Sequence, residues 1–164
     1  KDFYNSEDVI IRILHYWKDE MLTVKSFDEV TNTVMFSRLS SMSVYENHKY
    51  FLENVFEAEI DMFLDILKAV DDPRLKICLD LGHVSAYSET PVDEWIRQCA
   101  PYISHFHVHN NDGETDFHYS LQDGVMDMKT LLQLAEELCP DATYTIECVD
   151  AKPSLEWLAA EGLI

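Results

Sequence analysis

The sequence predicts an α/β fold built around a parallel sheet, and three observations support this. Short apolar stretches alternate with amphipathic stretches four times between residues 49 and 164. Turn-forming or helix-capping residues separate these stretches, and no internal repeat or Gly/Ser-rich linker divides the 164-residue chain. A chain of this length forms one domain with a buried core. Repeated alternation of strand and helix favours parallel strands joined by crossover helices.

Four segments are expected to be strands, because each is short, contains apolar or aromatic residues and is bounded by polar residues. Their ranges are 49–54, 75–81, 102–109 and 143–149. Asp71-Asp72-Pro73 is a natural break before the second of them. The first strand has an alternative: residues 44–70 could form one long helix, since Leu52, Phe56 and Phe63 share a helical face.

One helix is expected after each of these strands. The four helices cover Glu57–Val70, Pro91 to about Cys99, Asp127 to about Leu138, and Pro153–Ala160. Thr90 can cap the second helix, with Pro91 in its first turn, and Asp127 can cap the third.

The amino-terminal part of the chain follows a different pattern. Residues 6–22 are expected to be helical, because Ser6 can cap a helix and apolar residues recur after it at helical spacing. Ser26–Glu29 has the spacing of a capping box and predicts a second short helix. Thr31–Phe36 is expected to be a strand.

Charge and composition argue against several classes of protein. The 12 basic residues face 31 acidic ones, which gives a formal net charge of −19. Such a chain lacks the clustered cations that bind phosphates, so nucleic acid is not an expected partner. No run of about eighteen apolar residues is present, so no membrane span is expected. The four cysteines lie far apart without a CxxC pair, which favours free thiols in a cytoplasmic protein.

One ionisable side chain stands at or near the carboxyl end of each expected strand, on the face opposite the apolar one. The four residues are Glu53, Asp80, His107 and Glu147. Since the carboxyl ends of parallel strands meet at one edge of a sheet or barrel, we expect these side chains to converge. Three carboxylates repel one another without a cation, and the set contains no cysteine, so a divalent ion such as Mn, Zn, Mg or Co is expected.

Three further motifs contain potential ligands. Asp80–His83 places a histidine three residues after a strand-end aspartate, although an ordinary turn is also compatible with it. His105–His109 places three imidazoles on one strand face, and His105 alone could be a buried structural group. Asp116–His118 lies in the polar loop 110–124 and could instead be a solvated pair.

Together these motifs resemble the xylose isomerase-like TIM-barrel superfamily. That group contains sugar and sugar phosphate isomerases and epimerases, and the endonuclease IV type of DNA repair enzyme. The matching stretches are residues 53–57, 78–83, 107–113, 116–118 and 146–147. A full barrel needs about 250 residues, so the resemblance implies an incomplete TIM barrel with about the last four βα units. It divides the chain into an N-terminal helical or irregular segment and the C-terminal half of a TIM-barrel-like domain, residues 1–48 and 49–164.

The resemblance also implies roles for the candidate residues. One divalent ion would be bound by four ligands: Glu53, Asp80, His107 and Glu147. Of these, Glu53 and Glu147 would also be catalytic, because they would move protons at the carbon next to a metal-polarised carbonyl. His83 would contact the substrate or a further ion, and His109 would contact the substrate.

The loop that follows the third strand carries a further pair. Asp116 and His118 resemble the pair that holds an extra zinc in endonuclease IV-type members, so they are candidate ligands of a second ion. Two positions depart from the family's usual pattern: Asn110 stands where Asp is usual, and Gln122 stands where Gly is usual. Two histidine ligands that repair enzymes carry on early strands have no counterpart in this sequence.

The expected function is a divalent-metal-dependent isomerase or epimerase that acts on a small sugar or sugar phosphate. Two alternatives stay open: an endonuclease IV-like phosphodiesterase, against which the negative charge weighs, and a truncated, non-catalytic barrel fragment. The isolated chain is expected to show little activity, because an open site cannot exclude water. The edges of an incomplete barrel also suggest a partner that covers them, such as a second copy of the chain in a homo-oligomer.

Overall fold

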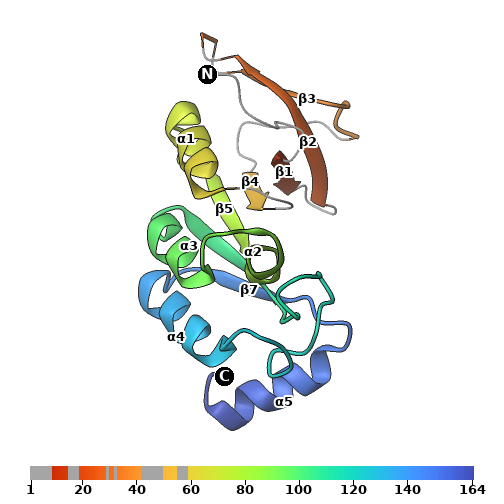
Figure 1. Cartoon of the computed structure of the whole chain (residues 1–164). Helices are drawn as coiled ribbons and strands as arrows, with labels where there is room; N and C mark the ends of the chain where they lie inside the picture. The colour runs from red at the N-terminus through yellow and green to blue at the C-terminus, as the bar shows by residue number, and fades with distance from the viewer. Residues whose placement is uncertain (1–8, 15–18, 29, 32, 42–49, 55–58) are drawn as a thin grey trace.

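A computed structural model describes residues 9–14, 19–28, 30–31, 33–41, 50–54 and 59–164 (Figure 1). Its strands form one seven-stranded sheet in the order β3-β2-β1-β4-β5-β6-β7. The four strands from β4 to β7 are parallel neighbours in chain order, whereas β1 runs antiparallel to both β2 and β4. No helix within the described ranges is long and apolar enough to cross a bilayer.

The parallel part of the sheet confirms the predicted α/β alternation. Its elements are β4 (Tyr50–Asn54), α1 (Ile60–Val70), β5 (Leu75–Asp80), α2 (Leu81–Tyr87), α3 (Val92–Cys99), β6 (Ile103–Val108), α4 (Met128–Leu138), β7 (Thr143–Ile146) and α5 (Ala151–Glu161). All four predicted strands are present. The alternative of a single helix over residues 44–70 is wrong, because β4 pairs with β5 before α1 begins.

The N-terminal region differs from its prediction. It contains β1 (Val9–Leu14), β2 (Asp19–Asp28) and β3 (Thr33–Phe36). The helix predicted over residues 6–22 is therefore wrong wherever that range is described, and so is the short helix predicted from Ser26. The strand predicted at Thr31–Phe36 is confirmed for Thr33–Phe36.

The composition of β1 explains why this segment is a strand and not the predicted helix. Its sequence, VIIRIL, is rich in β-branched residues, which pack well on a pleated surface. The same apolar residues also fit helical spacing, so periodicity over so short a run cannot decide between helix and strand. Pairing with β2 on one side and β4 on the other supplies every strand partner that β1 needs.

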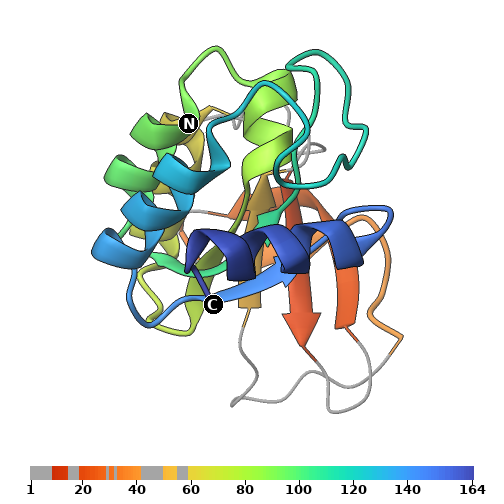
Figure 2. The ribbon, with the colours of Figure 1, turned by 90° about the horizontal axis from the view of Figure 1, so that it is seen from below.

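The helices that follow the parallel strands stack beside one another. α3 packs against both α1 and α4, and the three helices form one column in Figure 1 and one flank in Figure 2. Phe63 of α1 meets Trp95 of α3 edge to face, with ring centroids 5.5 Å apart. Fully buried side chains of the strands, such as Ile77, Leu79 and Phe106, complete the core. This arrangement leaves the opposite strand face for polar side chains.

The short helix α2 is not among the helices predicted from the sequence, which left an ordinary turn open at Asp80–His83. Asp80, the last residue of β5, is its N-cap, and the Asp80 carboxylate accepts a hydrogen bond from the backbone N–H of His83 at 3.0 Å. A capping aspartate at a strand end therefore starts the helix at once. The consequence is that His83 lies one turn above the end of β5.

Candidate metal centre

The four side chains predicted at the strand ends lie together. The Nδ1 atom of His107 is 3.0 Å from Glu53 Oε1 and 3.2 Å from Glu147 Oε1. It is also 3.6 Å from Asp80 Oδ2. Glu53, Asp80 and His107 are buried, whereas the Glu147 side chain is 29% exposed. Glu147 therefore gives this cluster, the strand-end cluster, its contact with solvent.

Sheet register explains why the side chains converge. Asp80 of β5 and His107 of β6 are direct partners across the parallel pair, and Glu53 of β4 is the partner of Cys78. Glu147 follows β7 immediately, and its backbone N–H donates to the Val108 carbonyl at 3.1 Å. All four side chains therefore leave the same edge of the sheet.

Asn54 was missed by sequence reasoning, although it supports the same edge. Its side-chain amide donates to the Asp80 carbonyl at 2.9 Å, and its carbonyl oxygen accepts from the Asp80 N–H at 2.8 Å. The backbone carbonyl of Asn54 also lies 2.7 Å from His83 Nδ1. Asn54 thereby ties the end of β4 to the end of β5. A strand-end asparagine gives no distinctive signal in the sequence.

A second group of side chains, the loop cluster, surrounds the Asp116 carboxylate. Asp116 Oδ2 is 3.2 Å from His83 Nε2 and 3.1 Å from His118 Nε2, and Asp116 Oδ1 is 3.3 Å from His109 Nε2. His109 Nε2 is also 3.2 Å from Asp80 Oδ1. The Asp80 carboxylate therefore touches both clusters, and the pair Asp116 and His118 is not solvated at a distance from the strand ends.

His109 is the most enclosed member of the loop cluster. Its side chain has no exposed area, and its ring stacks on that of His118 with centroids 3.9 Å apart. A Cβ atom on Gly82 would lie only 1.9 Å from Cε1 of His109. Gly82 therefore makes room for this ring, a role that the sequence could not indicate. In this structure His109 contacts two carboxylates rather than an open cavity, and its role as a substrate contact stays a prediction.

The loop 110–124 folds back over the strand ends through an asparagine network. The Asn110 amide donates to the carbonyls of Leu121 at 2.9 Å and Met126 at 3.1 Å. The Asn111 amide donates to the Gly82 carbonyl at 2.8 Å. An aspartate at position 110 has no N–H to donate, so this departure from the family's usual residue fits the loop that is present.

The electrostatics of the two clusters are strongly coupled. Burial lowers the pKa of His107, but hydrogen bonds to Asp80, Cys78 and Glu53 raise it to about 12. Burial likewise opposes the charge on His109, yet the contact with Asp80 raises its pKa above the usual value. Burial raises the pKa of Asp80, but the hydrogen bonds to His107 and His109 outweigh it and leave that pKa lowered.

These residues fit a divalent ion. Among the described residues, Asp80 Oδ2, His109 Nε2 and Asp116 Oδ1 are buried polar atoms without a well-aligned hydrogen bond, although each lies near an oppositely charged group. Buried polar atoms are normally satisfied, so such atoms facing one another indicate room for a shared positive charge. Carboxylate oxygens and imidazole nitrogens suit Mn, Zn, Mg or Co. Glu53, Asp80 and His107 offer ligand atoms within 4.8 Å of one another, as do His109, Asp116 and His118.

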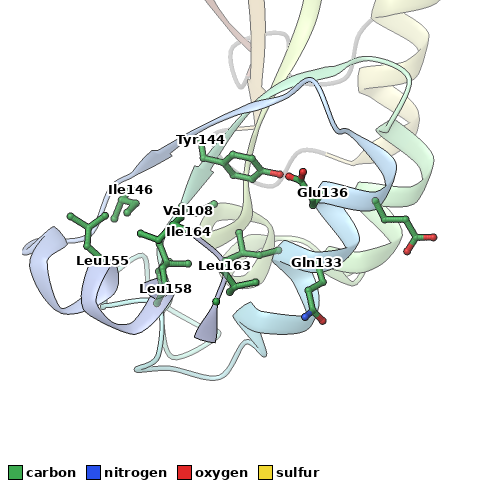
Figure 3. Close-up of a pocket in the computed structure, with 13 residues that line it drawn as sticks. Val108, Gln133, Glu136, Tyr144, Ile146, Leu155, Leu158, Leu163 and Ile164 are labelled. Carbon is green, nitrogen blue, oxygen red and sulfur yellow. The ribbon is translucent and has the colours of Figure 1, made fainter. Parts of the chain in front are cut away.

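A separate hollow of about 670 Å³ lies on the outer side of β7, away from these clusters (Figure 3). Side chains of β7, α4, α5 and the C-terminal residues line it, including Tyr144, Ile146, Leu158 and Leu163. Its lining is mainly apolar, and the strand-end and loop clusters contribute no residue to it. The candidate metal ligands of the two clusters therefore lie outside this hollow.

Comparison with known proteins defines the family. The family model described as Xylose isomerase-like TIM barrel matches residues 38–162, and the chain belongs to this family. An uncharacterized protein of Methanocaldococcus jannaschii, MJ1311, is 28% identical over 88 residues, which is 53% of this chain and 30% of that protein.

Three solved structures share the fold. A D-tagatose 3-epimerase-like protein has a TM-score of 0.57 and 24% identity, covering 68% of this chain and 42% of its own. The TTHB071 protein from Thermus thermophilus, soaked with ZnCl2, has a TM-score of 0.55 and 25% identity, covering 68% and 43%. A xylose isomerase domain protein from Planctomyces limnophilus has a TM-score of 0.55 and 21% identity, covering 66% and 43%. The chain thus spans less than half the length of these relatives.

Proposed function

We propose that this chain carries the metal-binding part of a divalent-metal-dependent isomerase or epimerase of a small sugar or sugar phosphate. The observation that carries the proposal is the strand-end cluster, in which three carboxylates surround one imidazole nitrogen at 3.0–3.6 Å. Membership of a family with sugar-epimerase-like structures supports the substrate class. The activity of the whole protein is part of the proposal, because the match covers only 42–43% of the related structures.

The ligands in this proposal are Glu53, Asp80, His107 and Glu147. A divalent ion held there would polarise the carbonyl of a bound sugar and acidify the neighbouring carbon. Glu147, the most exposed of the four, would take the proton from that carbon. Glu53, on β4, would return a proton from the other flank of the β5–β6 pair. His83, which is only 15% exposed beside Asp116, would contact a substrate hydroxyl.

A second candidate function is a metal-dependent phosphodiesterase of the endonuclease IV type. The loop cluster favours it, because His83, Asp116 and His118 could hold a further ion. A relative of known structure was soaked with ZnCl2, which supports zinc as a candidate metal. The net charge of −19 weighs against binding to a DNA backbone.

Deuterium exchange separates the two functions. The full-length protein, as it is produced in the cell, is incubated with Mn or Zn in deuterated water and a panel of ketoses and aldoses. Proton NMR should show deuterium at the carbon next to the carbonyl, and Glu147→Gln should reduce the rate by roughly 10²–10⁴. Cleavage of an abasic oligonucleotide, with no exchange on any sugar, would assign the phosphodiesterase instead.

A further inference from the structure

A further group of potential metal ligands, Cys78, His105 and His107, lies next to the strand-end cluster, toward the start of β5 and β6. Cys78 and His105 are direct partners across β5 and β6, and His107 follows two residues later on the same face of β6. The Sγ atom of Cys78 and one ring nitrogen each of His105 and His107 all lie within 4.8 Å of one another. The rings of His105 and His107 meet edge to face with centroids 5.3 Å apart.

Cys78 and His105 differ in their exposure to solvent. Cys78 is buried, with 1% of its surface exposed, whereas His105 is only half-buried. The His105 ring lies between two hydroxyls of β7, with Nδ1 2.6 Å from Thr143 Oγ1 and Nε2 2.9 Å from Thr145 Oγ1. Both threonines are exposed, so an ion in solution can reach the group from the β7 side.

The ligand atoms of Cys78, His105 and His107 are softer Lewis bases than the carboxylate oxygens of the strand-end cluster. One thiolate and two imidazoles suit zinc and the more thiophilic divalent ions, which take four ligands in tetrahedral sites. Neutral His105 has one ring nitrogen with a lone pair, which accepts a hydrogen bond from one of the two threonine hydroxyls. Rotation of that threonine side chain would free the lone pair for an ion. Three protein ligands leave the fourth position to water.

We propose that Cys78, His105 and His107 form a thiolate-containing site for zinc-like divalent ions, which shares only His107 with the carboxylate site of Glu53, Asp80, His107 and Glu147. The thiol proton of Cys78 passes to solvent when the sulfur binds the ion. Because His107 is a ligand in both sites, a thiophilic ion bound by Cys78 and His105 competes with an ion bound by the carboxylates. The site does not depend on the proposed sugar chemistry, because the proposed proton-transfer residues, Glu53 and Glu147, are not among its ligands.

Cobalt is the probe, because a sulfur ligand gives Co2+ a thiolate-to-metal charge-transfer band that oxygen and nitrogen ligands do not. The wild-type chain titrated with Co2+ should develop this band. Cys78→Ser should abolish it. Cys148→Ser is the matched control, because that thiol contacts Ser154 and not the two histidines, and this variant should keep the band. Asp80→Asn removes a carboxylate ligand but none of Cys78, His105 and His107, so it should also keep the band.

Cadmium NMR of the wild-type chain provides a measurement that needs no substitution, in case Cys78→Ser fails to fold. A chemical shift in the range of sulfur-ligated cadmium supports the site. A cobalt band that persists in folded Cys78→Ser would overturn it. So would the absence of both the band and the sulfur-type shift while equilibrium dialysis shows that the ions are bound, because only oxygen and nitrogen ligands would then be in use.

Discussion

The antiparallel half of the sheet, β1–β3, and the parallel half, β4–β7, differ in how deeply their strands are buried. The parallel strand β5 is buried along almost its whole length, whereas β3 alternates between exposed and half-buried residues. The central parallel strand β5 is covered on both faces, whereas the parallel edge strand β7 is mostly exposed, and an antiparallel strand can leave one face in water. Parallel strands also direct all their carboxyl ends to one edge. Accordingly, every candidate ligand in the described part of the chain lies from β4 onward.

The strand β4 belongs to both regions. It is parallel to β5 and antiparallel to β1, and Glu53 is the partner of Ile10 on one side and of Cys78 on the other. The N-terminal strands therefore support the site by pairing with β4 beside Glu53, although their described residues supply no candidate ligand. Substitutions in the two regions should separate stability from metal binding.

The largest effect is expected in the helical layer of the parallel region. Trp95 is fully buried, packs edge to face on Phe63 and donates from Nε1 to Ser88 Oγ at 3.0 Å. Trp95→Ala should lower the free energy of unfolding by about 3–5 kcal/mol. Urea unfolding followed by circular dichroism measures this. Leu39→Ala, at a side chain that is 91% exposed, is the control and should have little effect. Similar losses for both variants would contradict the core described above.

The next effect concerns metal binding rather than stability alone. Gly82→Ala places a Cβ against the His109 ring and should displace it from Asp80 and Asp116. Loss of such support should weaken metal affinity by roughly 10–100-fold. Isothermal titration with Mn or Zn measures the change.

A second glycine provides the control for this substitution. Gly162 has a φ of +69° but nothing within 4 Å of its Cβ position, so Gly162→Ala should strain the backbone and leave metal affinity unchanged. Equal affinity losses in both variants would show that general destabilisation, and not the His109 ring, is responsible.

A smaller effect is expected in the loop above the strand ends. Asn110→Asp removes two donated hydrogen bonds, to Leu121 and Met126, from a fully buried side chain. The cost should be about 1–3 kcal/mol. Hydrogen exchange should speed up within residues 110–126 while the amides of β5 stay protected. Faster exchange throughout the parallel strands instead would mean that the loop is not a separate unit.

The smallest effect is a pH-dependent one at the start of α4. The side-chain and backbone hydrogen bonds from Thr130 lower the pKa of Asp127. A lowered folded-state pKa means that the ionised carboxylate stabilises the fold above its unfolded pKa of about 3.9, and that this is lost as the pH falls through the folded value. Thermal unfolding should therefore distinguish wild type from Asp127→Asn at neutral pH and not in strong acid. A difference that grows in acid would contradict the assignment.

The sequence allowed the strand-end cluster to be predicted, because alternation along four strands places Glu53, Asp80, His107 and Glu147 on one edge. It could not decide the N-terminal strands, because the apolar residues of Val9–Leu14 fit both periodicities. Contacts that depend on tertiary packing were also beyond it: the space that Gly82 leaves for a ring 27 positions later has no local signal.

The central claim is that the edge formed by the parallel strands binds a divalent ion. Crystals of the chain soaked in Zn2+ or Mn2+ should give an anomalous difference peak between the carboxylates of Glu53, Asp80 and Glu147 and a ring nitrogen of His107. For zinc the ligand distances should be about 2.0–2.2 Å. Peaks confined to surface carboxylates, with these four side chains turned away from one another, would contradict the claim.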